Sequence, residues 1–315
     1  MPRYLLPILC LLISAISAAA VPIRVVTYNT ENFFDCRHDS LKNDSAFLPE
    51  GNYHWLPSRY RKKIHNLSQV ICNIGSTDSS YVCPAIIGLQ EVENDSCLIA
   101  LLRHLPHEHF PYKYIHYESA DLRGIDVALL YDTILFSAVS AHPIPVPHDS
   151  IVRPTRDILY ASLNSGRNTL HCFVCHLSSQ LGGAARSEQR RQQVAEIIKH
   201  HTDSILSLDS AAHIIVMGDF NSRPQQNIPP LTNLLYKYPT EIGTHKYHGI
   251  WEILDQIYVS PALLRHVSQP VIYSPSWLIE RDLKHLGVRP KRTFIGPRYV
   301  GGYSDHLPVY IDLRW

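Results

Sequence analysis

The sequence predicts an α/β fold in which two β-sheets pack face to face and helices cover their outer surfaces. Segments with strand patterns far outnumber helical ones, and the helical segments are spread along the chain rather than grouped. No repeat or linker-like segment divides the sequence. A chain of 315 residues with 45% hydrophobic residues can bury a large core, so we expect one domain.

Hydrophobic spacing places most of the elements. In segment 58–74, apolar residues such as Ile64, Leu67 and Ile71 recur at helical intervals and leave a basic face for solvent. Segments 85–92 and 213–220 are continuous apolar runs, typical of buried strands, and segment 306–313 alternates as a half-buried strand does. Strands are also predicted at 23–28 and 254–260, and helices at 96–105 and 187–206.

Two hairpins are expected in the middle of the chain. Strands at 125–131 and 134–144 form the first in this interpretation. Strands at 156–163 and 169–177 form the second, joined by the turn sequence NSGRN.

The first 20 residues read as a secretory signal peptide. Arg3 precedes an apolar run, and Ala18 and Ala20 suit the positions before a cleavage site. The run is short for a membrane-spanning helix, so we expect an exported protein, periplasmic or secreted, without stable membrane insertion after cleavage. Loss of Arg3 leaves 28 basic and 28 acidic residues. This balance disfavours a pure nucleic-acid-binding protein but leaves a nuclease with a local site open.

Six cysteines remain in the mature chain, and export permits their oxidation. Cys72 and Cys83 flank a loop and could pair. Cys172 and Cys175 resemble a metal-binding or redox motif, but they lie three residues apart on a predicted strand and would point to opposite faces. We therefore expect buried thiols at these two positions.

Polar side chains follow the apolar strands at six places. Four carboxylates, two carboxamides and two imidazoles would meet if these strand ends lie at one edge: Asn29, Glu91, His176, Asp219, Asn221, Asp255, Asp305 and His306. Crowded carboxylates raise one another's pKa unless a cation compensates them. Carboxylate and carboxamide oxygens suit Mg²⁺, with Mn²⁺ or Ca²⁺ as alternatives. The imidazoles could then transfer protons.

Each stretch alone has a simpler explanation. The Asp219 to Asn221 stretch after a strand is often only an Asx turn, and Asp305 and His306 could merely end a loop. Their joint occurrence in this order is harder to explain as turns.

In combination, the stretches YNTENFF, LQEVEN, GDFNSRP, LDQI and SDHLP resemble the endonuclease/exonuclease/phosphatase superfamily, over residues 23–313. This superfamily includes pancreatic-type DNase, AP endonucleases, sphingomyelinases and inositol-polyphosphate 5-phosphatases. The resemblance implies a DNase I-like four-layer α/β sandwich formed by residues 21–315, and metal-dependent hydrolysis of phosphoester bonds.

The resemblance also implies roles for single residues. Glu91 would be the main metal ligand, with Asn29 beside it and Asp305 completing the site. Asp219 and Asn221 would orient the attacking water and the phosphate. His306, paired with Asp255, would be the general base or a phosphate-binding imidazolium. His176 occupies the position of a second histidine in DNase-like members.

Further residues are candidates for substrate contact. Asp126 is the proposed acidic partner of His176, with a simple strand-edge residue as the alternative. Arg123 and Arg156 precede strands and could bind phosphate. Arg186, Arg190 and Arg191 are expected to be solvated surface residues.

The function favoured by the sequence is that of an exported Mg²⁺-dependent nuclease that acts as a monomer on phosphodiester bonds. The first alternative is a phosphatase or phospholipase acting on inositol phosphates or lipids. The inositol 5-phosphatases carry Trp-Cys-Asp-Arg where this chain has LDQIYV, which disfavours that alternative. A non-catalytic binding protein is the third possibility, but Glu91, Asp219 and His306 are all present.

Overall fold

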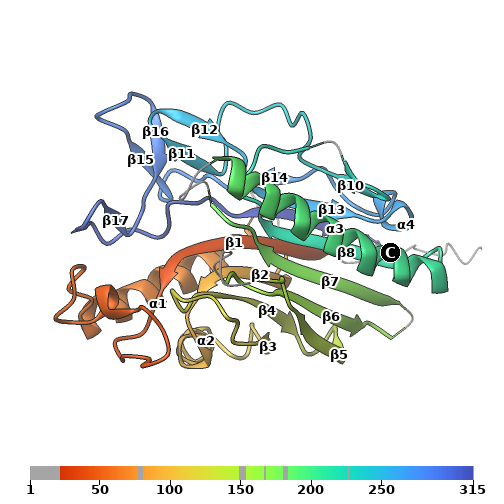
Figure 1. Cartoon of the computed structure of the whole chain (residues 1–315), viewed down its shortest axis with the longest axis horizontal. Coiled ribbons are helices and arrows are strands. Elements are labelled where there is room, and N and C mark those ends of the chain that lie inside the picture. Colours follow the sequence, from red (N-terminus) through yellow and green to blue (C-terminus); the bar gives the residue numbers. More distant parts are fainter. Residues whose placement is uncertain are drawn as a thin grey trace, which may run out of the picture.

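The computed structural model describes residues 22–76, 81–148, 154–166, 168–179, 184–225 and 227–314, so the expected signal peptide lies outside the described residues. Two large mixed sheets form its centre (Figure 1). The first sheet has the order β14 (Val271–Ile272), β19 (Val309–Leu313), β1 (Ile23–Phe33), β2 (Pro84–Val92), β4 (Asp126–Asp132) and β3 (Tyr112–His116). The second has the order β5 (Ser137–Ile144), β6 (Ile158–Asn164), β7 (Thr169–His176), β8 (His213–Asp219), β13 (Asp255–Val259), β10 (Leu231–Asn233) and β9 (Asn227–Ile228).

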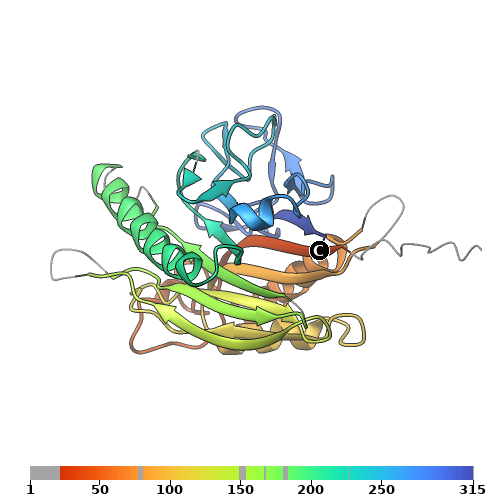
Figure 2. The ribbon, with the colours of Figure 1, turned by 90° about the vertical axis from the view of Figure 1, so that its right-hand side faces the viewer.

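Helices cover the outer faces of both sheets. The apolar stripes of α1 (Pro57–Asn73) and α2 (Asp95–His104) pack on the first sheet. On the second sheet, α3 (Ala184–Leu208) lies along the outer face (Figure 2). Its Val194 and Ile198 side chains pack with Phe173 and Val216. The order helix, sheet, sheet, helix confirms the expected α/β sandwich.

The helices begin where the sequence supplies start signals. Pro57 occupies the first turn of α1, where its missing N–H costs nothing. Asn94 caps α2, because its side chain accepts a hydrogen bond from the backbone N–H of Cys97 at 3.1 Å. Asp95 in the first turn and Arg103 in the last turn of α2 also suit the helix dipole.

The two sheets approach each other closely at their centre. Gly88 of β2 faces Met217 of β8, and a Cβ atom at Gly88 would lie only 3.1 Å from the methionine side chain. Cys172 and Cys175 point to opposite faces of β7, the first into the core between the sheets and the second toward α3. Both are buried free thiols, as expected, and Cys72 and Cys83, which could have paired, are also free thiols.

The second predicted hairpin is confirmed, but the first is wrong. β6 pairs antiparallel with β7, with Leu159 opposite Val174 at one end and Asn164 opposite Thr169 at the other. β4, by contrast, lies between β2 and β3 in the first sheet, so it has no free edge for β5. The short link after Asp132 therefore carries the chain to the second sheet, where β5 pairs with β6.

Short strands in the last third of the chain were not predicted. Three small sheets pair β11 (His245–Tyr247) with β12 (Ile250–Glu252), β15 (Ile279–Arg281) with β16 (Val288–Pro290), and β17 (Phe294–Ile295) with β18 (Arg298–Tyr299). The short helices η1 (Ser45–Phe47) and α4 (Pro261–Leu264) complete the elements. Within the described residues, no helix is long and apolar enough to cross a membrane.

Candidate active site

Three polar residues form a row across the end of the second sheet. β7 and β8 run parallel and pair His176 with Asp219, and the antiparallel strand β13 pairs Asp255 with the same Asp219. All three side chains are buried, because the sheet ends under covering loops rather than in solvent. The register of three strands thus brings together residues that are 36 to 79 positions apart in sequence.

The first sheet contributes Asn29 and Glu91 from neighbouring parallel strands. Asn29 pairs with Gln90, and the register shifts on either side of Glu91. Glu91 has a φ of 63°, an unusual left-handed conformation for glutamate that re-aims the side chain at this bulge. The backbone N–H of Asn32, itself at φ 53°, donates to Glu91 Oε2 at 2.7 Å and holds the carboxylate in place.

A hydrogen bond joins the two sheets at the centre of the site. Asn29 Nδ2 donates to Asp219 Oδ2 at 3.0 Å. The backbone N–H of Asn221 donates to Asp219 Oδ1 at 2.8 Å, so the stretch after β8 does form an Asx turn. The side chain of Asn221 donates to the carbonyl oxygen of Leu177 at 2.9 Å. The Asx turn therefore also positions Asp219 and Asn221 in the candidate site. The explanation of this stretch as a turn does not exclude its explanation as a functional site.

Ser304 holds the loop that carries Asp305 and His306. Its hydroxyl donates to the Asn29 carbonyl oxygen at 2.7 Å and accepts from the backbone N–H of His306 at 3.0 Å. His306 Nδ1 then lies 2.7 Å from Asp255 Oδ2, and its Nε2 lies 3.8 Å from Asp219 Oδ2. The expected pair of His306 with Asp255 is present.

The two histidines have opposite electrostatic surroundings. Burial lowers the pKa of His176 well below its usual value, and the charges of Arg156 and Arg123 lower it further. Burial acts on the pKa of His306 in the same direction, but Asp255 and Asp219 outweigh it and raise this pKa well above its usual value. Burial and the neighbouring arginines thus favour the neutral form of His176, whereas the neighbouring carboxylates favour the imidazolium form of His306.

Sequence reasoning missed two buried charged residues beside this site. Lys63 of α1 donates from Nζ to Thr293 Oγ1 at 2.6 Å and to the Tyr303 carbonyl oxygen at 2.7 Å. Glu31 accepts from the backbone N–H groups of Thr293 and Phe294. Burial raises the pKa of Glu31 and lowers that of Lys63, and both groups interact with the charge of Asp305. Lys63 was missed because it lies in the segment that predicted a basic, solvent-facing helix surface. Glu31 lies in the YNTEN stretch, which was the only sequence signal that could have identified it.

Several donors in the site fit a divalent cation. Asp305 Oδ2 has basic neighbours only beyond hydrogen-bond length, with His245 Nε2 at 3.8 Å and Arg292 Nη2 at 3.9 Å. Glu91 Oε1 lies 3.9 Å from His176 Nε2. Donor atoms of His245, Asp305 and His306 lie within 4.8 Å of one another. Carboxylate oxygens without short hydrogen bonds are suited to Mg²⁺, which keeps part of its water shell.

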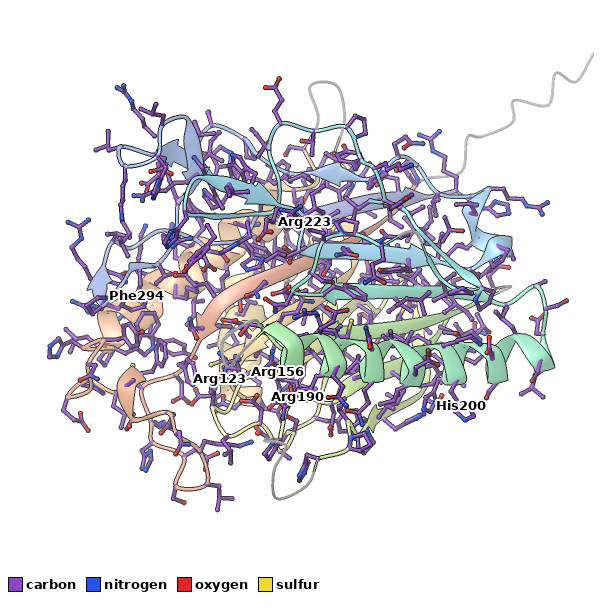
Figure 3. All side chains as sticks on the ribbon, turned by 45° about the horizontal axis from the view of Figure 1, so that its top comes forward. Arg123, Arg156, Arg190, His200, Arg223 and Phe294 are labelled. Carbon is purple, nitrogen blue, oxygen red and sulfur yellow. The ribbon has the colours of Figure 1, made fainter. Side chains whose placement is uncertain are left out.

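Arg156 links the substrate side of the site to a neighbouring loop. It is buried, and its guanidinium donates to Asp121 Oδ2 and to the Leu177 carbonyl oxygen, both at 3.1 Å. Leu177 also accepts the hydrogen bond from Asn221, so its carbonyl oxygen connects Arg156 to the Asx turn after β8. Arg123 is half exposed, with Nε 3.8 Å from Asp121 Oδ1 (Figure 3).

Asp126 is not the partner of His176. Both carboxylate oxygens of Asp126 lack a hydrogen-bond partner among the described residues, and so does the Nδ1 atom of His176. Asp126 instead lies in a separate group with His116 and Glu118. The expectation fails because Asp126 lies beside His116 of β3, a strand that was not predicted from the sequence.

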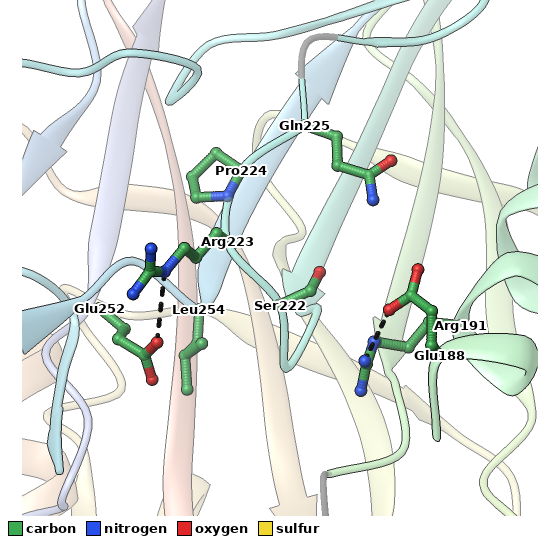
Figure 4. Close-up of a pocket in the computed structure, with 8 residues that line it drawn as sticks. All are labelled: Glu188, Arg191, Ser222, Arg223, Pro224, Gln225, Glu252 and Leu254. Atoms are coloured by element: carbon green, nitrogen blue, oxygen red, sulfur yellow. Dashed lines mark hydrogen bonds and ion pairs between the residues drawn. The ribbon is translucent and has the colours of Figure 1, made fainter. Parts of the chain in front are cut away.

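A cavity of about 480 Å³ lies beside the catalytic turn (Figure 4). Its lining includes Arg191 and Arg223, which are paired with Glu188 at 2.7 Å and Glu252 at 3.5 Å. Arg191 is largely buried, so its expected place on the solvated surface is wrong, while the side chain of Arg186 lies outside the described residues.

A family model matches almost the whole chain. The family model described as Endonuclease/Exonuclease/phosphatase family matches residues 24–315. No curated protein matches the chain.

Solved structures share the fold. Truncated TDP2 from Caenorhabditis elegans has 15% identity and a TM-score of 0.58, covering 93% of this chain and 98% of that one. A mannosyl-6-phosphatase from Bacteroides thetaiotaomicron has 17% identity and a TM-score of 0.59, covering 93% and 100%. The human nocturnin catalytic domain with bound sulfate has 18% identity and a TM-score of 0.54, covering 93% and 94%. The sandwich is thus the DNase I-like fold.

Proposed function

Because the chain belongs to the endonuclease/exonuclease/phosphatase family, a family of phosphoester hydrolases, we propose that it is an Mg²⁺-dependent phosphodiesterase that cleaves nucleic acid. We further propose that residues 1–20 direct its export, to a periplasm or outside the cell, and that residues 21–315 form one catalytic domain. The neutral charge balance of the mature chain suggests that local groups, rather than a global field, bind the substrate.

The arrangement of two histidines around one carboxylate carries this proposal. His176 Nε2 lies 3.6 Å and His306 Nε2 lies 3.8 Å from Asp219 Oδ2. One imidazole is neutral and the other is charged, for the electrostatic reasons given above. Hydrolysis of a phosphodiester needs a base for the attacking water and an acid for the leaving alkoxide, and this pair supplies both.

Each residue then has a role that follows from its contacts. Neutral His176 takes the proton of the water, which Asp219 and Asn221 orient. His306, held by Asp255, binds the phosphate and gives a proton to the leaving oxygen. Arg156 adds positive charge beside the reacting group.

The metal ligands of this proposal are Glu91, Asn29 and Asp305. When bound, Mg²⁺ supplies positive charge that stabilises the anionic transition state. In the metal-free protein, the buried cation of Lys63 reduces the repulsion between the carboxylates of Glu31, Glu91 and Asp305.

The test is nicking of supercoiled plasmid by residues 21–315 in Mg²⁺ and in EDTA. We expect nicking that requires Mg²⁺ and is lost in His306→Ala and in His176→Ala. His107→Ala, at an exposed turn residue, is the matched control and should keep full activity. Intact DNA and RNA together with cleavage of bis-p-nitrophenyl phosphate would overturn the nucleic-acid substrate but keep the phosphodiesterase.

One observation favours a second candidate function, that of a phosphomonoesterase on small molecules. The cavity beside Asn221, lined by the pairs Arg191–Glu188 and Arg223–Glu252, has the size of a small-molecule site. The mannosyl-6-phosphatase with the same fold is a precedent for such a substrate class. Release of phosphate from mannose 6-phosphate, lost in Arg223→Ala and without any nicking, would favour this candidate.

A further inference from the structure

Three side chains with metal-binding atoms gather outside the active site, where β3 ends and β4 begins. Donor atoms of His116, Glu118 and Asp126 lie within 4.8 Å of one another. Because His116 pairs with Ala128 across the strands, the His116 and Asp126 side chains lie on the same face of the first sheet. The beginning of α2, with Asp95, lies over this face.

The hydrogen-bonding pattern leaves three buried atoms of this group without partners. His116 Nδ1 lies 3.0 Å from Asp95 Oδ1 and must donate to it, because a carboxylate only accepts. The neutral ring then presents a lone pair at Nε2. This atom and both carboxylate oxygens of Asp126 are buried and have no hydrogen-bond partner among the described residues. Ser119 and Lys42 also favour the charged carboxylate of Asp126, but a cation between these three acceptors would satisfy all of them at once.

We propose that His116, Glu118 and Asp126 bind a transition-metal ion of the Zn²⁺ class at a second site, separate from the catalytic metal. An imidazole nitrogen with two carboxylates is a donor set for Zn²⁺ rather than for Mg²⁺, which prefers oxygen ligands only. The Asp95 contact is also the arrangement that metal-bound histidines show, in which a carboxylate fixes the ring through its other nitrogen.

The geometry needs only a small adjustment to hold the ion. Tetrahedral Zn²⁺ with bonds of about 2.0–2.2 Å places its ligand atoms about 3.4 Å apart. Glu118 is exposed and its side chain can close this gap. Lys42 Nζ lies 3.8 Å from Glu118 but is held mainly by the carbonyl oxygens of Ser119 and Asp121, so it can stay in place when Glu118 moves.

The position of the site gives the ion a structural role. The ligands lie at both ends of the loop 117–125, which carries Asp121 and Arg123. Asp121 holds Arg156, and Arg156 is connected to the catalytic turn through Leu177. A bound ion would therefore join β3 to β4 and keep Asp121 in register with Arg156.

The test is equilibrium dialysis of the metal-free protein against Zn²⁺ in excess Mg²⁺, with metal counted per chain. We expect the Asp126→Asn variant to bind one Zn²⁺ fewer than the wild type. Glu118→Gln should bind this ion more weakly, and Asp95→Asn about 10–100-fold more weakly. Glu108→Gln, an exposed glutamate at a turn, should match the wild type.

A second measurement guards against misfolding of the buried variant. Zn²⁺ should raise the Tm of the wild type, and this rise should be smaller in Glu118→Gln, whose exposed side chain leaves the fold intact. Equal Zn²⁺ stoichiometry in the wild type, Asp126→Asn and Glu118→Gln would overturn the proposal. A wild type that binds no Zn²⁺ would overturn it as well.

Discussion

His306 Nδ1 lies 2.7 Å from Asp255 Oδ2, and this hydrogen bond crosses from one sheet to the other. His306 lies three residues before β19 of the first sheet, whereas Asp255 begins β13 of the second. The contact fixes the Nδ1–H proton on the histidine and turns Nε2 toward Asp219. The orientation of His306 thus depends on how the two sheets pack.

The first prediction concerns Asp255→Asn. The amide keeps the shape of the side chain but removes the charge that holds His306 as an imidazolium, so kcat for phosphoester hydrolysis should fall about 10²–10⁴-fold. Steady-state kinetics measure this. The His306→Ala/Asp255→Asn double variant should be little worse than His306→Ala, because the two residues act as a unit. Additive losses would show that Asp255 acts independently of His306.

The second prediction concerns metal dependence. Glu91→Gln removes the charge of the main proposed ligand, so the Mg²⁺ concentration for half-maximal activity should rise at least tenfold. Titration of activity with Mg²⁺ measures this. Asp255→Asn is the matched comparison, since it should lower kcat with an unchanged Mg²⁺ midpoint. An unchanged midpoint in Glu91→Gln would assign the metal to other carboxylates, such as Asp305.

The third prediction concerns the buried cation of α1. Lys63→Met leaves Glu31 without the cation that compensates it and the Tyr303 carbonyl oxygen without its donor, so the free energy of unfolding should fall by about 3–5 kcal/mol. Urea unfolding measures this. Lys62→Met, at the exposed neighbour, should change stability by about 0.5 kcal/mol or less. A stable Lys63→Met protein would mean that the carboxylates are protonated at neutral pH.

The fourth prediction concerns pH and the hairpin of β15 and β16. Asp282 Oδ2 lies 3.1 Å from Lys246 Nζ, and Asp282 Oδ1 accepts from the backbone N–H groups of Lys284 and His285. Burial opposes ionisation of this carboxyl, but these hydrogen bonds outweigh it and lower its pKa from 3.8 to about 2.

Because the folded pKa lies below the unfolded one, the contribution of Asp282 to stability is present above pH 3.8 and is lost as pH falls through about 2. Asp282→Asn should therefore lower the free energy of unfolding by about 1–3 kcal/mol at pH 6, and the difference from the wild type should shrink below pH 4. Urea unfolding from pH 3 to 7 measures both curves. A difference that stays constant at low pH would contradict the ionic role.

The sequence alone determined where most long strands lie and which polar residues end them. Period-2 alternation and buried runs are local patterns, so β2, β8 and β19 were located within a few residues. Asn29, Glu91 and Asp219, which lie toward the ends of β1, β2 and β8, were recognised because carboxylate and amide groups at strand ends have a limited set of chemical uses. Ser304 was expected only to hold a loop, and its two hydrogen bonds show how it does so.

Only the tertiary structure decided which residues meet. The separation of β4 and β5 into different sheets, the place of Asp126 beside His116 and the burial of Lys63 all depend on contacts between distant segments. A local pattern reports which face of an element is apolar. It does not report which strand lies at the neighbouring edge of a sheet, or which distant groups bind a lysine such as Lys63. Those contacts are set by packing two sheets against each other, which no single segment encodes.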